Sequence, residues 1–243
     1  MWYFTADLHL NHSNIIKYSN RPFMNQVELG LMDLVRNGSI PISEVSISKE
    51  STDLMTDTII DSINNVVSKR DKLVIIGDFC FSRSNDREKY IGKLRSRIKC
   101  QNVYLILGNH DDKSICEKYF QCAEQYMFKI DGQNIFTSHY PCRSWDKRIY
   151  GSWMLYGHVH GLFSREDIFG ISKEQEEKIR EQILKYISEP DKVDALVNSI
   201  RSTKPKLLTL DVGVDNKREN YPFGSPWSFQ DIKKHMNCIL NCD

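Results

Sequence analysis

The chain changes from apolar to polar within one short stretch, residues 103–111, which read VYLILGNHD. An unbroken run of five apolar residues, 103–107, is typical of a β-strand that is buried on both faces. Gly108, Asn109, His110 and Asp111 follow at once, and Gly and Asn both tolerate the positive φ angles of tight turns. The stretch therefore predicts a buried strand with polar, reactive side chains at its carboxyl end.

Other segments repeat this strand pattern, with helical patterns between them. The first half of the chain has expected strands at residues 2–6, 73–76 and 103–107. Residues 52–68, between the first two strands, place apolar side chains at helical spacing, and residues 83–97 are a second helix candidate. Strands that alternate with helices indicate right-handed crossovers and a largely parallel sheet.

The second half of the chain predicts a second sheet. Residues 126–130 and 134–138 flank Asp131-Gly132, a pair that fits the primed turn of a β-hairpin. Further strands are expected at residues 153–156 and 207–214. We expect an α/β fold in which two mixed sheets pack face to face with helices outside, a four-layer α/β/β/α sandwich.

The 243 residues are expected to form a single domain, 1–243, with two insertions. Residues 37–50 are rich in Ser and Ile and hold one Gly and one Pro, which is typical of a surface loop. The second insertion, at about 164–206, predicts a helical hairpin with helices at 174–188 and 191–201. Its charge runs are interpreted as a solvated face.

Composition excludes several classes of protein. The chain is 40% hydrophobic, and 33 basic residues against 32 acidic ones leave a net charge of +1. A protein that coats long nucleic acid by charge alone is usually far more basic. The seven cysteines include no Cys-x-x-Cys pair, so we expect reduced thiols rather than a zinc ribbon or a disulfide framework. No apolar run approaches the roughly 20 residues of a membrane span, so we expect a soluble, cytoplasmic protein without a membrane partner.

Five short polar motifs follow the expected strands. They are Asp7-Leu8-His9, Gly77-Asp78, Gly108-Asn109-His110-Asp111, Ser138-His139 and Gly157-His158-Val159-His160. Each motif alone fits an ordinary turn, a helix cap or a buried neutral histidine. Ligands of open α/β sheets gather beyond the carboxyl ends of strands, and every one of these motifs lies there. Together the motifs therefore predict one shared site.

The residue types of this site favour divalent metal ions. Carboxylate, imidazole and amide oxygen suit Mn, Fe, Zn or Ni, and the motifs contain no cysteine that would favour a structural zinc. One Asp has two oxygens and can bridge two ions. Two ions about 3.5–4 Å apart clamp the attacking and leaving oxygens of a displacement at phosphorus.

The motifs D-x-H, G-D, G-N-H-D/E, H and G-H-x-H resemble those of the calcineurin-like metallophosphoesterases, and they occur in the family's order from Asp7 to His160. Residues 12–18, 21–23 and 212–215 further resemble small bacterial and phage members of this family. The resemblance implies the four-layer fold, two divalent ions and hydrolysis of a phosphate ester by a hydroxide that bridges the ions. Manganese is the ion expected to support activity in vitro.

The resemblance also implies a role for each motif residue. The implied ligands are Asp7, His9 and His160 for one ion, Asn109, His139 and His158 for the other, and Asp78 as the bridge. His110 would contact substrate phosphate and protonate or stabilise the leaving group. Asp111 would accept the second ring proton of His110 and so orient it.

Three residues near the motifs are candidates for binding substrate. Arg21 and Arg143 are expected in loops, where their guanidinium forks could grip phosphate. His12 could line the loop after the first strand. Ordinary surface arginines and a hydrogen-bonded loop histidine are the alternatives.

The sequence thus predicts a metal-dependent phosphatase or phosphodiesterase that acts on a phosphate-ester small molecule or a nucleotide. A nuclease acting on short single strands is the alternative enzyme, since a local basic channel would not change the total charge. A binding scaffold that keeps the fold without the reaction is the alternative from another class. Such a scaffold would be expected to lack a ligand or His110, and none is missing here. Because the ions contact only phosphate, the motifs leave the substrate and the oligomeric state open.

Overall fold

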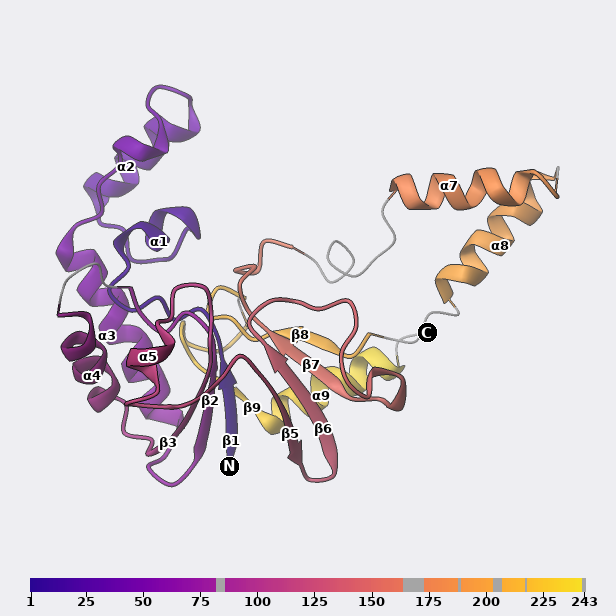
Figure 1. The fold of residues 1–243 in the computed structure, drawn as a ribbon. Coiled ribbons are helices and arrows are strands. Elements are labelled where there is room, and N and C mark those ends of the chain that lie inside the picture. The colour runs from indigo at the N-terminus through magenta and orange to yellow at the C-terminus, as the bar shows by residue number, and fades with distance from the viewer. Residues whose placement is uncertain (82–85, 164–172, 188, 203–206, 217, 242–243) are drawn as a thin grey trace.

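The computed structural model describes residues 1–81, 86–163, 173–187, 189–202, 207–216 and 218–241. These residues form two mixed β-sheets and eight α-helices (Figure 1). The predicted α/β class with two mixed sheets is confirmed. None of the described helices is both long and apolar enough to cross a membrane.

The first sheet collects the short apolar runs of the first half of the chain. Its strand order is β4-β3-β2-β1-β9. The bounds are Trp2–Thr5 for β1, Lys72–Ile76 for β2, Asn102–Ile106 for β3, Gln121–Ala123 for β4 and Trp227–Ser228 for β9. Strands β1 to β4 are parallel, and β9 pairs antiparallel with β1. The sequence predicted β1, β2 and β3 closely, but it predicted neither β4 nor the short β9.

The second sheet has the strand order β5-β6-β7-β8. The bounds are Gln125–Ile130 for β5, Gln133–Ser138 for β6, Trp153–Tyr156 for β7 and Thr209–Asp211 for β8. The predicted hairpin joins β5 to β6 through Asp131 and Gly132, whose φ angles of 47° and 84° are those a primed turn needs. Strands β6, β7 and β8 are parallel, so their carboxyl ends lie at one edge. A bridge between Ala6 and Gly213 brings the end of β1 beside the segment after β8.

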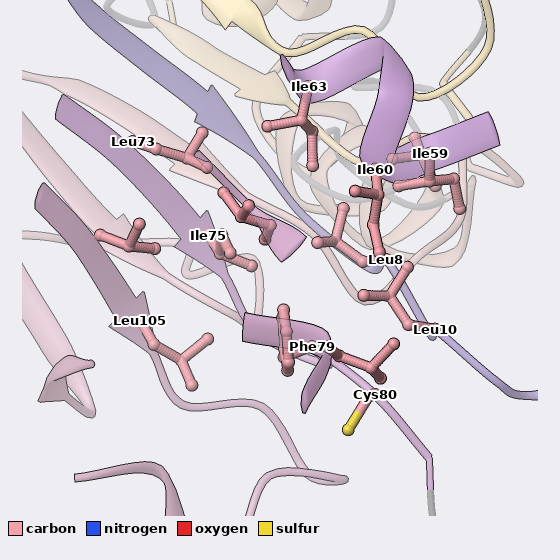
Figure 2. Packing of buried hydrophobic residues seen from close by; sticks show 14 of the residues in the cluster. Leu8, Leu10, Ile59, Ile60, Ile63, Leu73, Ile75, Phe79, Cys80 and Leu105 are labelled. Atoms are coloured by element: carbon pink, nitrogen blue, oxygen red, sulfur yellow. The ribbon is translucent and has the colours of Figure 1, made fainter. Parts of the chain in front are cut away.

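The helices of the first half of the chain are α1 (Ser13–Tyr18), α2 (Gln26–Arg36), α3 (Lys49–Val66), α4 (Arg87–Arg97) and α5 (Lys113–Cys116). All of these helices except α2 pack on the outer face of the first sheet, and α2 projects away from it (Figure 1). Figure 2 shows Ile60 and Ile63 of α3 in one cluster with Leu73 and Ile75 of β2. Full burial of a side chain of this size stabilises the fold by roughly 1.5–3 kcal/mol. This packing holds the first sheet rigid below its polar edge.

A second apolar core lies between the two sheets. Phe4 of the first sheet meets Ile135 and Leu155 of the second in this cluster. Helix α9 (Phe229–Asn241) adds Ile232 to the same core. The two sheets are therefore fixed against each other, and so are the loops at their edges.

The predicted surface loop 37–50 is more ordered than expected. It contains a 3-10 turn at Ile42–Glu44 and the start of α3. Lys17 is buried, and its Nζ donates to the carbonyls of Ile42 at 3.0 Å and Val45 at 2.6 Å. These two hydrogen bonds tie residues 42–45 to α1.

The two helices predicted at 174–188 and 191–201 are present as α7 (Lys173–Leu184) and α8 (Pro190–Ser202). Both helices project from the two-sheet body, and α7 packs against α8 (Figure 1). Val193 and Val197 of α8 are buried. The parts of the insertion at 164–172, 188 and 203–206 lie outside the described residues.

Candidate metal centre

The predicted motifs converge at the carboxyl ends of five strands. Strands β1, β2 and β3 run parallel in the first sheet, and β6 and β7 run parallel in the second. The polar residues that follow them are Asp7 and His9 after β1, Asp78 after β2, Asn109 and His110 after β3, His139 after β6, and His158 and His160 after β7. Packing of one sheet on the other brings these strand ends together, so the motifs form a single cluster.

Several of these residues have left-handed backbone conformations. The φ angles are 55° at Asp7, 46° at His9, 55° at Asp78, 71° at His158 and 51° at His160. A non-glycine residue in this region costs about 1–3 kcal/mol, and such strain gathers at functional sites. Five of the ten non-glycine residues with positive φ among the described residues belong to the motifs, which favours a functional site over a set of unrelated turns.

Asp7 is fully buried against the motif that follows β7. Both of its carboxylate oxygens lie 2.9 Å from the backbone nitrogen of His158 and accept its N–H. A Cβ atom at Gly157 would lie 2.5 Å from Asp7 Oδ2, so glycine is needed there. Burial raises the pKa of Asp7 to about 7. One backbone N–H therefore does not offset the loss of water, and a nearby cation would stabilise the carboxylate.

His9 has a buried ring nitrogen without a hydrogen-bond partner. Its Nε2 lies 3.3 Å from Asp78 Oδ2 but makes no hydrogen bond there. Its Nδ1 lies 3.3 Å from Nδ1 of His12, so one of these two rings donates to the other. Burial lowers the pKa of His9 to about 2, and the ring is neutral. A metal ion between this neutral imidazole nitrogen and the carboxylate would bind to both groups.

His139 places its second ring nitrogen among other acceptor atoms. Its Nδ1 lies 3.1 Å from the carbonyl of Ile76, and a carbonyl only accepts, so Nδ1 carries a proton. Its Nε2 lies 3.1 Å from Asn109 Oδ1 and 3.5 Å from Asp78 Oδ2. Burial lowers the pKa of His139, but its hydrogen bond to Asp78 and the charges of Asp7 and Asp78 outweigh that effect and raise the pKa to about 9. These acceptor atoms therefore need a proton or a cation between them.

Three groups of Asp and His side chains have ligand atoms close enough to hold an ion. They are Asp7, His9 and His160; Asp7, Asp78 and His139; and His9, Asp78 and His110. Within each group the ligand atoms lie within 4.8 Å of one another. The groups share Asp7, His9 and Asp78, so they describe adjacent positions in one cluster. Oxygen and nitrogen donors without a thiolate fit divalent transition metals.

Two predicted ligands lie at the rim of this cluster. His158 is exposed, and its ring centre is 5.0 Å from that of His139 and 4.4 Å from that of Tyr140. It belongs to none of the three groups found among the described residues. Asn109 is also exposed, but its side-chain oxygen faces His139. Among the predicted Asp and His ligands, His158 is therefore the one that lies outside the three groups of the described structure.

Asp111 has a different role from the one that the resemblance implied. Its Oδ1 accepts the backbone N–H of Phe79 at 3.0 Å, and its Oδ2 accepts those of Asp78 at 2.8 Å and Gly108 at 2.9 Å. Both oxygens are thus engaged by the backbone. Asp111 ties the end of β2 to the end of β3, and it does not hydrogen-bond to the ring of His110 in the described structure.

Arg21 also differs from its predicted role as a grip for substrate phosphate. The residue is only 1% exposed. Its guanidinium donates to both carboxylate oxygens of Asp215 and to the carbonyls of Asp7 and Leu8. Because these acceptors are internal, Arg21 holds the loop after β1 and does not face solvent.

The other two substrate candidates remain near the site or on the surface. His12 lies in the loop after β1, and its ring stacks on Phe81 with ring centres 4.2 Å apart. Arg143 is exposed in the segment between β6 and β7. Both side chains stay candidates for binding substrate.

Asp215 is a site residue that the five motifs did not predict. Its Oδ2 lies 2.7 Å from Nδ1 of His160 and also accepts from Arg21. Burial raises the pKa of Asp215, but the charge of Arg21 and the hydrogen bond from His160 outweigh this effect and hold the pKa below its usual value. The sequence signal was the 212–215 segment, which was noted only for its resemblance to small family members. The contact with Arg21 spans 194 positions, so no local pattern reveals it.

Comparisons with known proteins agree with this geometry. The chain is 27% identical over 204 residues to an uncharacterized protein of Methanocaldococcus jannaschii, MJ1445, which is 83% of this chain and 92% of that protein. The crystal structure of AQ665 from Aquifex aeolicus, a protein of unknown function, has a similar fold with a TM-score of 0.53. It is 18% identical, over 97% of this chain and 98% of that one. The family model of the calcineurin-like phosphoesterases matches residues 3–226, which include every motif of the site, and the chain therefore belongs to this family.

Proposed function

We propose that this chain is a dinuclear metal-dependent phosphoesterase that hydrolyses a phosphomonoester or phosphodiester of nucleotide type. The observation that carries the proposal is the position of Asp78. Its Oδ2 lies 3.3 Å from Nε2 of His9 and 3.5 Å from Nε2 of His139. These two histidines belong to different candidate groups, and a carboxylate between them supports a bridge between two ions.

In this proposal the cluster holds two ions through the residues that the motifs indicate. Asp7, His9 and His160 hold one ion, Asn109, His139 and His158 hold the other, and Asp78 bridges. The orphaned Nε2 of His9 supports the first group, and the acceptors around Nε2 of His139 support the second. When bound, two divalent ions, with manganese the choice in vitro, supply charge that binds phosphate and activates water at neutral pH.

His110 is the residue proposed to handle the proton of the leaving group. Its backbone N–H donates to Asp78 Oδ1 at 2.9 Å, and its carbonyl accepts from Arg87. The ring is partly exposed, with its centre 5.3 Å from that of His9 and 5.8 Å from that of Phe81. The backbone is thus held on both sides, and the partly exposed ring is the group proposed to donate a proton to the oxygen of a departing group.

Tyr140 supports a substrate with a flat group beside its phosphate. The residue is 48% exposed and its ring lies edge-on to His158, with ring centres 4.4 Å apart. An exposed aromatic ring at the rim of a phosphate site offers a surface on which a base can stack. This position favours a nucleotide-type substrate over a small aliphatic ester.

Hydrolysis of p-nitrophenyl phosphate and of its bis-ester with added Mn²⁺ tests the proposal. We expect activity in the parent protein, two Mn²⁺ per chain, and loss of activity in Asp78→Asn. Asp33→Asn is the matched control, because Asp33 is an exposed carboxylate of α2 that pairs with Arg36. The ratio of the two esters separates monoester from diester preference. A folded parent that binds fewer than two ions and hydrolyses neither ester would favour the binding scaffold instead.

We propose in addition that residues 1–243 form one domain in which the insertion at about 164–206 adds selectivity for the substrate. The projection of α7 and α8 from the body supports this division, because neither apolar core contains a described residue of those helices.

A further inference from the structure

Arg21 and Asp215 form a buried ion pair behind the candidate ligands. The two side chains are 0% and 3% exposed. Nε and Nη2 of Arg21 donate to Oδ1 and Oδ2 of Asp215 at 2.9 and 2.7 Å. A pair joined by two parallel hydrogen bonds has a defined geometry as well as a favourable energy. The position of the Asp215 carboxylate is therefore set by Arg21.

The remaining donors of Arg21 are used at the loop after β1. Nη2 also donates to the carbonyl of Asp7 at 2.8 Å. Nη1 donates to the carbonyl of Leu8 at 3.0 Å and to Sδ of Met55 at 3.4 Å. A guanidinium has five N–H groups, and each of them has an acceptor here. Lysine has only three donors on a flexible stem, so it cannot reproduce this arrangement.

Asp215 in turn orients the ring of His160. Its Oδ2 lies 2.7 Å from Nδ1 of His160. A carboxylate accepts, so Nδ1 carries the proton and Nε2 is left to bind an ion. The ring of His160 stacks on that of His9, with centres 5.1 Å apart and planes 28° apart. Arg21 and Asp215 thus act on both the backbone of Asp7 and the ring of His160.

The ligands proposed for the other ion are held differently. His139 donates from Nδ1 to the carbonyl of Ile76 and faces Asn109 with Nε2. Within the described residues, neither Arg21 nor Asp215 hydrogen-bonds to His139 or Asn109. The two candidate groups therefore differ in the residues that hydrogen-bond to their ligands.

We infer that Arg21 and Asp215 are positioning residues for one ion only, the ion of the Asp7, His9 and His160 group. The pair fixes these ligands before an ion binds, and it adds Asp215 to a site whose motifs omit it. The inference rests on the proposed two-ion function.

Calorimetric titration of the metal-free protein with Mn²⁺ tests this inference. Asp215→Asn keeps the shape of the side chain but removes an acceptor from either Arg21 or His160. We expect this variant to bind one Mn²⁺ as the parent does and the other about 10- to 100-fold more weakly. Arg21→Lys is expected to weaken the binding of the same Mn²⁺ by a similar factor. Glu28→Gln is the control, because Glu28 is a buried carboxylate that accepts from the backbone of Asn25 and Ser48, neither of which belongs to a motif.

Glu28→Gln should lose stability but bind both ions as the parent does. Equal weakening of both ions in Asp215→Asn, or binding of both as in the parent, would overturn the inference. A parent that binds fewer than two ions would contradict the proposed function instead. If Asp215→Asn does not fold, nuclear magnetic resonance of the metal-free parent decides. The Nδ1 proton of His160 should give a slowly exchanging downfield signal that His160→Gln lacks, and its absence would overturn the inference.

Discussion

Gly77 joins β2 to Asp78, and its replacement by alanine measures how tightly the site is packed. Its φ is +84°, and a Cβ atom there would lie 2.1 Å from Nδ1 of His139. Gly132, in the turn between β5 and β6, has the same φ of +84° but has no atom within 4 Å of the Cβ position. The two glycines form a matched pair with the same φ and with the contact present at one position only.

The expected cost follows from these two observations. Alanine in the left-handed region costs roughly 1–2 kcal/mol at either position. At Gly77 the added methyl group must also displace a buried ring, and such overpacking costs roughly 1–3 kcal/mol. The displaced ring loses its hydrogen bond to the carbonyl of Ile76. We therefore expect Gly132→Ala to lower the free energy of unfolding by about 1–2 kcal/mol and Gly77→Ala by about 2–5 kcal/mol.

Urea unfolding of the metal-free variants, followed by circular dichroism, gives these free energies. A Mn²⁺ titration then shows whether the ion proposed for His139 binds more weakly in Gly77→Ala, as expected from movement of the ring. Gly132→Ala should bind both ions as the parent does. Equal losses of stability in the two variants would refute the reasoning, because the contact with His139 would then add nothing to the backbone strain.

Further outcomes are expected for His110, for the insertion and for Cys80. His110→Ala should keep both ions, as measured by metal analysis, and lose about 10²- to 10⁴-fold in kcat, because its role is in proton transfer. Replacement of residues 164–206 by a short Gly-Ser linker should change the preference among nucleotide substrates more than hydrolysis of bis-p-nitrophenyl phosphate. Burial raises the pKa of the Cys80 thiol to about 12, so iodoacetamide at pH 8 should label the exposed Cys238 first and Cys80 only on unfolding. The stability that buried neutral Cys80 provides is complete below pH 9 and falls as the pH rises toward 12, which urea unfolding of Cys80→Ala against the parent can measure.

A specific result would contradict each of these predictions. Loss of an ion in His110→Ala would make His110 a ligand, as its group with His9 and Asp78 allows. Equal loss on nucleotides and on the bis-ester after the deletion would remove the insertion from substrate selection. Rapid labelling of Cys80 in the folded protein would show that the loop after β2 opens.

The parts of the fold that sequence patterns predicted are those with their own local signal. Strands β1, β2 and β3 are short continuous apolar runs, and the β5–β6 turn carries the Asp-Gly pair that its backbone requires. Strand β9 has two residues and exists because its backbone pairs with β1, a contact that leaves no periodic pattern. Its position could not be read from residues 227–228 alone.

The same distinction applies to the site. The motifs located the candidate ligands because each motif follows a recognisable strand. The family resemblance assigned Asp111 to orient His110, but the turn directs its carboxylate to the backbone N–H groups of Phe79 and Gly108. Arg21 appeared to be a loop arginine, and only the folded chain shows that Asp215 is its partner. Patterns therefore identified the chemical groups, whereas the hydrogen bonds that orient them required the tertiary structure.

The carboxylates of the site also support the backbone, and this leads to a last prediction. Asp7 accepts the N–H of His158, Asp78 accepts that of His110, and Asp111 accepts that of Gly108. The first two of these bonds each join one motif to another, and all three are made between protein groups, so they do not depend on an ion. Small structural metal sites, by contrast, unfold when a chelator removes the metal.

Treatment with EDTA should therefore abolish activity while it leaves the far-ultraviolet circular dichroism spectrum unchanged. Mn²⁺ should then restore activity without a slow refolding phase, because the ligand loops are already in place. Unfolding on chelation would mean that the ions hold the loops together and that the hydrogen bonds from Asp7 and Asp78 are too weak to do so. Only a site whose loops are tied by the protein itself can release its ions and bind them again with its geometry intact.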